Sequence, residues 1–229
     1  MMADRELAFS TFLKLLELPE PQKKTTLRGF LRGGGFNYWR PLQNLASEVV
    51  GGELKLGDMQ EKVGLMARGH QRKYNDRALT NLLKWAGRRR IQLRKRPEKI
   101  VRKFGNTGLR IRLQPEVAFA MGGRSYLMHI WATNNPTLSE ETLSMGLYFF
   151  RRHFQETGQP DTQYLIFDTV KDRIIAEFNI LDSAATMLTQ HRDLLSNLWS
   201  SVNGEDESPP ASRPGDRPPE RPDDRPFGP

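Results

Sequence analysis

Residues 109–133 constrain the fold of this chain more than any other stretch; they read LRIRLQPEVAFAMGGRSYLMHIWAT. Two apolar runs, 117–121 and 126–131, flank Gly122-Gly123, and paired glycines supply the positive φ angles of a tight β-turn. Because both runs are almost continuously apolar, we expect a hairpin whose strands are covered on both faces. The stretch therefore predicts an α/β fold with a central mixed sheet flanked by helices.

The order of features in this stretch resembles the restriction-endonuclease-like superfamily, whose nuclease motif is PD-(D/E)xK. An acid follows proline at Pro115-Glu116, and an apolar strand, a glycine turn and a second apolar strand come next. A typical hairpin length places the (D/E)xK triplet on His129-Ile130-Trp131. The resemblance covers roughly residues 40–178. It implies a restriction-endonuclease-like core in this part of the chain.

The resemblance also implies a divalent cation held by two carboxylates, and here the chemistry departs from the family pattern. Glu116 keeps its carboxylate, but His129 stands at the second acid and Trp131 at the lysine. Mg²⁺ prefers oxygen ligands, histidine tolerates Mn²⁺ better, and tryptophan neither carries charge nor binds metal. On an apolar strand, moreover, His129 and Trp131 are more often core residues than ligands. We therefore expect a catalytically inactive nuclease scaffold that needs no cofactor.

The alternative that stays open is an active nuclease with Mg²⁺ or Mn²⁺ as cofactor. In that case Glu116 and His129 are the candidate catalytic residues, and Glu116 and Glu48 the candidate metal ligands. Glu48 matches the extra acid that the family often carries on its first core helix, and Asp168 is a further candidate. The missing base would come from another element, and the candidates are Arg112, Arg124 and Arg151.

Charge divides the chain sharply. Residues 1–103 hold 23 Lys and Arg against 10 Asp and Glu, residues 104–203 hold 8 against 10, and residues 204–229 hold 4 against 7. The net positive charge therefore lies entirely before the hairpin, as expected of a surface that binds phosphates. We divide the chain into a basic, mainly helical nucleic-acid-binding part (1–103), an α/β nuclease-like core (104–203) and a tail (204–229).

The positive charge is densest from Arg88 to Lys103, where nine basic residues accompany the single acid Glu98. Alternation of Ile91 and Leu93 with basic residues predicts a strand or extended arm that Pro97 ends. Self-repulsion this strong favours an anionic partner. The candidate nucleic-acid-binding residues are Arg72, Lys73, Arg88, Arg89, Arg90, Arg94, Lys95, Arg96, Lys99, Arg102 and Lys103.

Apolar periodicity assigns the rest of the chain. Thr25 or Thr26 is expected to cap the second helix, Asn75 or Asp76 the fifth, and Thr137 or Ser139 the sixth. Strands at 163–167 and 173–180 extend the sheet. The expected helices are 4–18, 22–32, 41–50, 55–69, 74–87, 137–154 and 183–199.

Composition limits the remaining possibilities. The chain has no cysteine, which fits a reducing cytoplasm, and it has no apolar run long enough to cross a membrane. Residues 204–229 are rich in proline, arginine and acids and cannot bury enough surface to fold, so we expect a disordered tail. The sequence thus predicts a cytoplasmic protein that binds nucleic acid, DNA more readily than RNA, without sequence preference. A protein-interaction subunit of a larger nucleic-acid-processing complex is a further alternative.

Overall fold

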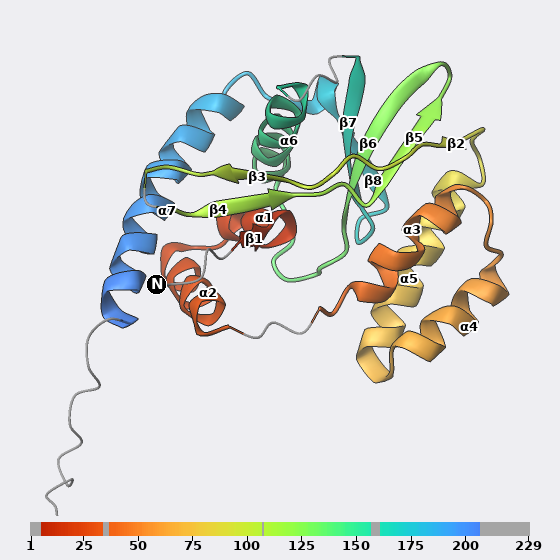
Figure 1. The fold of residues 1–229 in the computed structure, drawn as a ribbon, viewed down its shortest axis with the longest axis horizontal. Helices are drawn as coiled ribbons and strands as arrows, with labels where there is room; N and C mark the ends of the chain where they lie inside the picture. Colours follow the sequence, from red (N-terminus) through yellow and green to blue (C-terminus); the bar gives the residue numbers. More distant parts are fainter. Residues whose placement is uncertain (1–5, 34–36, 107, 157–160, 207–229) are drawn as a thin grey trace, which may run out of the picture.

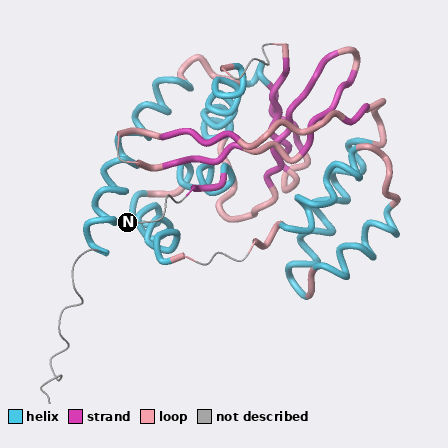
Figure 2. Tube along the Cα trace, viewed as in Figure 1, coloured by secondary structure: helices cyan, strands magenta, loops and turns pink. Residues whose placement is uncertain are grey.

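The computed structural model describes residues 6–33, 37–106, 108–156 and 161–206. The first two residues of the helix expected at 4–18 and the tail expected beyond residue 206 lie outside this part of the chain. The fold is α/β, with two mixed sheets, and helices cover both faces of the larger sheet (Figure 1). Figure 2 shows the strands of the two sheets as separate groups joined by loops. Within the described part of the chain, no helix is both long and apolar enough to cross a membrane.

The hairpin is the centre of the larger sheet, as the sequence predicts. Strand β5 (Val117–Met121) pairs antiparallel with β6 (Arg124–Trp131), and the register places Val117 opposite Met128. Gly122 and Gly123 join them with φ angles of 56° and 78°, which a Cβ-bearing residue adopts only with strain. The sheet order is β2-β5-β6-β7-β8, in which β6 is flanked on both sides and its second half is buried.

The connection after the hairpin makes the sheet mixed. Helix α6 (Glu140–Gln155) carries the chain to β7 (Thr162–Asp168), which runs parallel to β6, and β8 (Arg173–Ala176) then closes the edge. Ser139 caps α6, since its Oγ accepts a hydrogen bond from the Thr142 backbone N–H at 3.2 Å. This confirms one of the two expected caps. The other edge strand, β2 (Gln92–Leu93), pairs with β5.

Side chains of β6 alternate between two cores. Leu127 and Trp131 face the first, which α1 (Phe9–Glu17), α2 (Glu20–Arg32), α6 and α7 (Ala184–Asp206) cover. Met128 and Ile130 face the second, which α3 (Arg40–Val50), α4 (Leu56–Met66) and α5 (Gly69–Ala86) cover. The expectation that the hairpin is covered on both faces is therefore confirmed.

A second, smaller sheet has the order β1-β4-β3. Strand β4 (Arg110–Leu113) lies between β1 (Glu6–Ala8), which is parallel to it, and β3 (Ile100–Lys103), which is antiparallel. Strands before residue 104 thus pair with strands after it in both sheets, and the chain does not divide at residue 103. Long-range pairing of this kind leaves no local signal in the sequence.

Several expected boundaries are wrong. The helix expected at 4–18 is divided, because Glu6–Ala8 pairs with β4 and only residues from Phe9 onward are helical. Helix α5 begins at Gly69, so the basic residues 70–73 lie in the helix instead of a turn. The strand expected at 173–180 ends at Ala176, where a 3₁₀ turn (Glu177–Asn179) follows, and α7 runs beyond residue 199 to Asp206.

Two expected caps are also wrong. Helix α2 begins at Glu20, and the hydroxyl of Thr25 donates to the carbonyl of Pro21 inside it. Asn75 lies within α5 and is fully buried. Its Oδ1 accepts a hydrogen bond from the backbone N–H of Leu42 at 3.0 Å, so it caps the first turn of α3 from another helix.

Candidate functional site

The basic segment, residues 88–103, runs along the exposed edges of both sheets. Its first strand, β2, is the edge of the larger sheet, and its second, β3, is the edge of the smaller one (Figure 1). The strand expected before Pro97 is confirmed as β2, which is only two residues long, and Pro97 lies in the loop that leads to β3, a strand that the sequence did not predict. Side chains of Arg88, Arg89, Arg90, Arg94, Lys95, Arg96, Lys99 and Lys103 are exposed, and that of Arg102 is half-buried.

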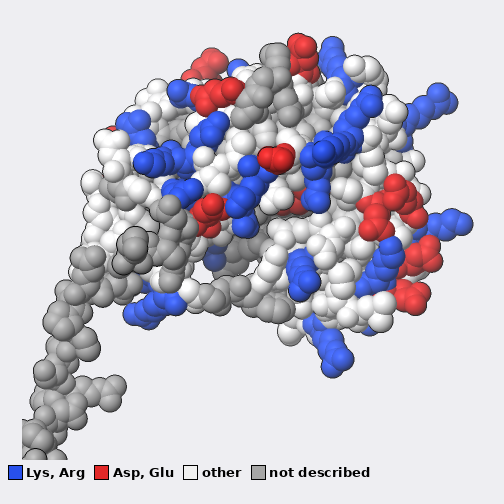
Figure 3. All heavy atoms as spheres, in the orientation of Figure 1, with Lys and Arg blue, Asp and Glu red and all other residues white. Residues whose placement is uncertain are grey.

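Some of these cations have partners in the protein. Lys99 Nζ lies 3.2 Å from Glu6 Oε2, Arg102 Nε lies 3.9 Å from Glu156 Oε2, and the Arg89 guanidinium stacks over the Trp85 ring. Figure 3 shows Lys and Arg spread over the face that carries both sheets, with acids between them and a denser acidic area over α3 and α4. Surface pairs of this kind are weak and leave the cations available to a polyanion.

The two remaining candidates lie elsewhere. Arg72 and Lys73 are exposed on α5, where Arg72 Nε lies 3.6 Å from Asp76 Oδ2. Burial raises the pKa of the Asp76 carboxyl, and the neighbouring Arg72 partly opposes this shift. Because α5 covers the second core and is not part of either strand edge, the structure does not bring these residues into the basic segment.

Glu116 and His129 lie side by side, as the spacing of the motif predicts. Glu116 directly precedes β5, and its backbone N–H donates to the carbonyl of Met128 at 3.0 Å. His129 Nδ1 of β6 lies 2.8 Å from Glu116 Oε2. Both are buried, with exposures of 7% and 2%. The backbone also fixes the position of this carboxylate, because Oε2 accepts a hydrogen bond from the backbone N–H of Ile130 at 3.0 Å.

A pocket of about 220 Å³ opens beside this pair, at the junction of the two sheets, α1 and α3. Ser10, the second residue of α1, reaches it, and its Oγ lies 3.2 Å from His129 Nε2. Arg96 from the basic segment and Arg112 from β4 also line the pocket, with Gln43 and Asn44 from α3. Arg96 Nη1 also donates to the carbonyl oxygen of Glu116 at 3.3 Å. The pocket is therefore polar and joins the basic segment directly.

The remaining candidate ligands do not complete a metal site. Glu48 Oε2 lies 2.6 Å from Lys62 Nζ of α4, and Asp168 accepts hydrogen bonds from Val170, Lys171 and Arg173. Among the residues that the structure describes, no three His, Asp or Glu side chains come close enough to share an ion. Glu116 and His129 alone do not supply the oxygen ligands that Mg²⁺ requires, so the site does not fit the family's cation.

The displaced base that an active nuclease would need has one candidate at the site. Arg112 lines the pocket, whereas Arg124 is exposed in the hairpin turn and Arg151 Nη1 lies 3.5 Å from Glu177 Oε2. Trp131 is 2% exposed and packs in the first core. The position that corresponds to the family's lysine is thus structural.

Sequence reasoning missed Ser10, Gln43 and Asn44. Ser10 stands inside an apolar stretch that reads as one continuous helix, and 119 residues separate it from His129. The short strand before it, Glu6–Ala8, has no local signal of its own, because its residues continue the apolar spacing of the helix that follows. Contacts between segments so far apart follow from strand pairing, because β1 must lie beside β4 before α1 can point toward the hairpin.

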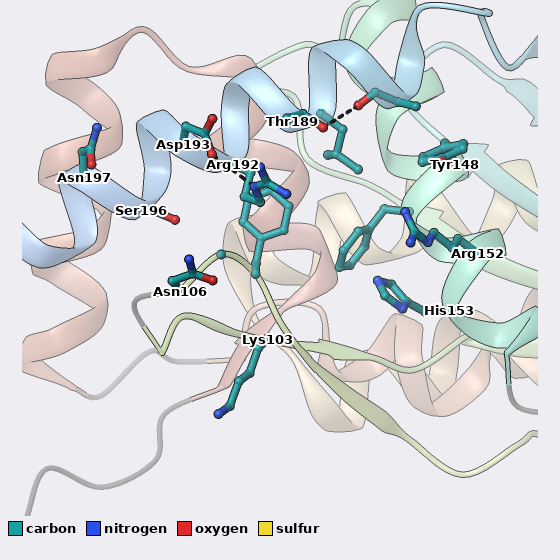
Figure 4. A pocket seen from close by; sticks show the side chains of 15 residues that line it. Lys103, Asn106, Tyr148, Arg152, His153, Thr189, Arg192, Asp193, Ser196 and Asn197 are labelled. Atoms are coloured by element: carbon teal, nitrogen blue, oxygen red, sulfur yellow. Dashed lines mark hydrogen bonds and ion pairs between the residues drawn. The ribbon is translucent and has the colours of Figure 1, made fainter.

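A larger pocket, of about 680 Å³, lies between α6, α7 and the turn after β3. Figure 4 shows Arg192 of α7 and Arg152 of α6 on opposite sides of it, while the amine of Lys103 is directed away. Arg192 Nε lies 3.1 Å from Asp193 Oδ1, and Arg152 Nε lies 3.6 Å from Glu156 Oε1. Because these acids balance the cations, we take the smaller pocket beside Glu116 as the candidate site.

Comparisons with protein-family models, with curated proteins and with solved structures find no match to this chain. The resemblance to the restriction-endonuclease-like superfamily therefore rests on the order of features around the hairpin alone.

Proposed function

We propose that this chain binds nucleic acid without sequence preference, with DNA as the first ligand to test, and that it lacks the metal-dependent cleavage of the nucleases it resembles. A cytoplasmic location belongs to the same proposal. The observation that carries it is the course of residues 88–103, which present eight exposed cations along two neighbouring sheet edges. Charged side chains on an edge contact phosphates, which carry no sequence information.

The residues that line the pocket beside Glu116 are a second observation that supports this proposal. Arg96 belongs to the exposed segment and to the pocket lining at once, and Arg112 adds a second guanidinium from β4. Two guanidinium groups in one polar concavity suit a phosphate, which they can bind through paired N–H donors. A nucleic-acid strand that lies along the basic segment would therefore bring one of its phosphates to this pocket.

Binding is tested with fluorescently labelled duplexes of two unrelated sequences, titrated at several salt concentrations. Changing Arg88, Arg89 and Arg90 to alanine should weaken both complexes equally, because each phosphate left without a cation lowers affinity without regard to bases. The slope of log K against log salt concentration should become shallower by up to about 0.9 for each phosphate that the variant no longer neutralises.

A matched variant controls for the change in net charge. Lys55, Arg68 and Lys171 are exposed and lie outside the basic segment, so their replacement by alanine removes the same charge from other surfaces. This control should keep most of the affinity. Equal losses in the two variants, or unchanged affinity of the Arg88–Arg90 variant, would remove the segment from the interface.

Cleavage is tested on linear, circular and single-stranded DNA and on RNA, with Mg²⁺, Mn²⁺ or a chelator. We expect neither ion to change the result, because the position of the family's lysine holds buried Trp131 and, among the described residues, Glu116 is the one carboxylate that lines the pocket. Metal-dependent cleavage that disappears in Glu116→Ala, while binding persists, would contradict this part of the proposal.

A further inference from the structure

We propose that Ser10, His129 and Glu116 form a nucleophilic triad, and that its substrate is a phosphodiester of the bound nucleic acid. The triad follows from distances in the pocket, whereas the choice of substrate rests on the function proposed above. Such a triad needs no metal ion, so it is independent of the family's cleavage chemistry.

The three side chains form a chain of contacts in the order that nucleophilic catalysis requires. Ser10 Oγ lies 3.2 Å from His129 Nε2, and His129 Nδ1 lies 2.8 Å from Glu116 Oε2. When Nε2 accepts the hydroxyl proton, Nδ1 carries the ring proton and faces the carboxylate. A nucleophile, a base and a third group that orients the base are the signature of an activated serine.

The protein holds the base and the carboxylate in place and leaves the nucleophile accessible. The His129 ring packs edge-on against Phe9 at 4.8 Å between centroids, with Phe150 on the same side, and the Ile130 N–H holds Glu116. Ser10 is only half-buried and lines the pocket. Rigid support behind an accessible hydroxyl is what a reacting serine requires.

One contact must tighten for the triad to act. The approach of His129 Nδ1 to Glu116 Oε2 is short, but it lacks the alignment of a hydrogen bond, and no other acceptor lies within reach of Nδ1 among the described residues. The proposal requires these two atoms to align when substrate binds. Hydrogen bonds of this kind are often loose before substrate binds.

The surroundings of Ser10 favour a phosphorus ester over a neutral one. Arg96 and Arg112 line the same pocket, and no side chain in the described part of the protein caps the N-terminus of α1, next to Ser10. The first N–H groups of a helix have no partner within it, so they are available to an anionic oxygen. Together these groups can stabilise the additional negative charge on a phosphate under attack.

The step is a transesterification at phosphorus. Ser10 Oγ forms a bond to phosphorus while the bond to one ester oxygen of the nucleic acid breaks. The proton leaves Ser10 for His129 Nε2, which keeps it until Ser10 is released, while the departing oxygen leaves from the opposite side of phosphorus and takes its proton from solvent water. Attack by water, or by the same alcohol in reverse, releases Ser10 with the proton moving back through His129. Glu116 is a positioning residue, since it acts only on the ring.

The first test uses an alkyl fluorophosphonate probe, which labels activated serines at phosphorus, with mass spectrometry to locate the label in the full chain. We expect labelling at Ser10, none at that position in Ser10→Ala, and labelling at least about 100-fold slower in His129→Gln. Thr11→Ala is the matched control on the same helix and should label normally. In labelled Glu116→Gln the His129 ring N–H resonance should lie upfield of its position in the labelled natural protein, which a purely structural role would not require. Absence of label at Ser10 in the natural protein overturns the triad.

The second test uses an oligonucleotide with a bridging phosphorothiolate, whose better leaving group favours a covalent protein–DNA adduct. The adduct should form in a chelator, map to Ser10, and be absent in Ser10→Ala. If the fluorophosphonate labels Ser10 but DNA does not bind, the proposed function fails and the triad stands without this substrate. Binding without an adduct, despite labelled Ser10, overturns the phosphodiester assignment.

Discussion

Replacing Asn75 with alanine should destabilise the protein by more than a typical surface change, because this side chain joins α5 to the start of α3. Its Oδ1 accepts from the Leu42 N–H at 3.0 Å, and its Nδ2 donates to the carbonyls of Tyr38 and Gln71 at 3.0 and 2.8 Å. The Tyr38 carbonyl keeps a second donor in Gln71 Nε2. Only the buried Leu42 N–H loses its partner altogether.

An unsatisfied buried donor costs about 1–3 kcal/mol, and the small volume removed adds to that. We therefore expect Asn75→Ala to lower the free energy of unfolding by about 2–3 kcal/mol, measured by urea denaturation followed through tryptophan fluorescence. Gln71→Ala is the matched control, because it removes one hydrogen bond to the Tyr38 carbonyl and leaves no buried donor without a partner. It should lower the free energy of unfolding by about 1 kcal/mol or less. Equal losses in the two variants, or a loss below about 0.5 kcal/mol for Asn75→Ala, would refute this reasoning.

Two further predictions concern the first core and the α6–α7 side. Trp131→Ala should lower the free energy of unfolding by about 3–5 kcal/mol, because the side chain is buried on the central strand; a loss below about 1 kcal/mol in urea denaturation would contradict its assignment to the core. Burial lowers the pKa of His153, against an opposing hydrogen bond to Glu156. The unfolded chain therefore takes up this proton first, and stability should fall as the pH drops below about 6.5. His153→Gln should lose less stability than the natural protein between pH 7 and pH 5, and equal losses would contradict this sign.

Features that depend on near neighbours follow from the sequence. The hairpin register follows from two glycines between apolar runs, and the start of α6 follows from a serine that caps it and acids in its first turn. The closeness of Glu116 and His129 belongs to the same class, because antiparallel strands joined by a tight turn place residues at equal distances from the turn opposite each other. Each of these signals is contained in fewer than about 20 residues, within one supersecondary motif.

The sequence by itself determined the hairpin, most of the helices and the concentration of cations between residues 88 and 103. Only the tertiary structure decided that residues 6–8 form a strand, that Asn75 caps a distant helix, and that Ser10, Arg96 and Arg112 meet beside His129. Helix periodicity and turn chemistry act between residues a few positions apart, so they are visible in the chain. Pairing between β1 and β4 depends on which strand edges remain unpaired once the other strands have formed. These edges belong to segments far apart in the chain, so no local sequence pattern predicts the pairing.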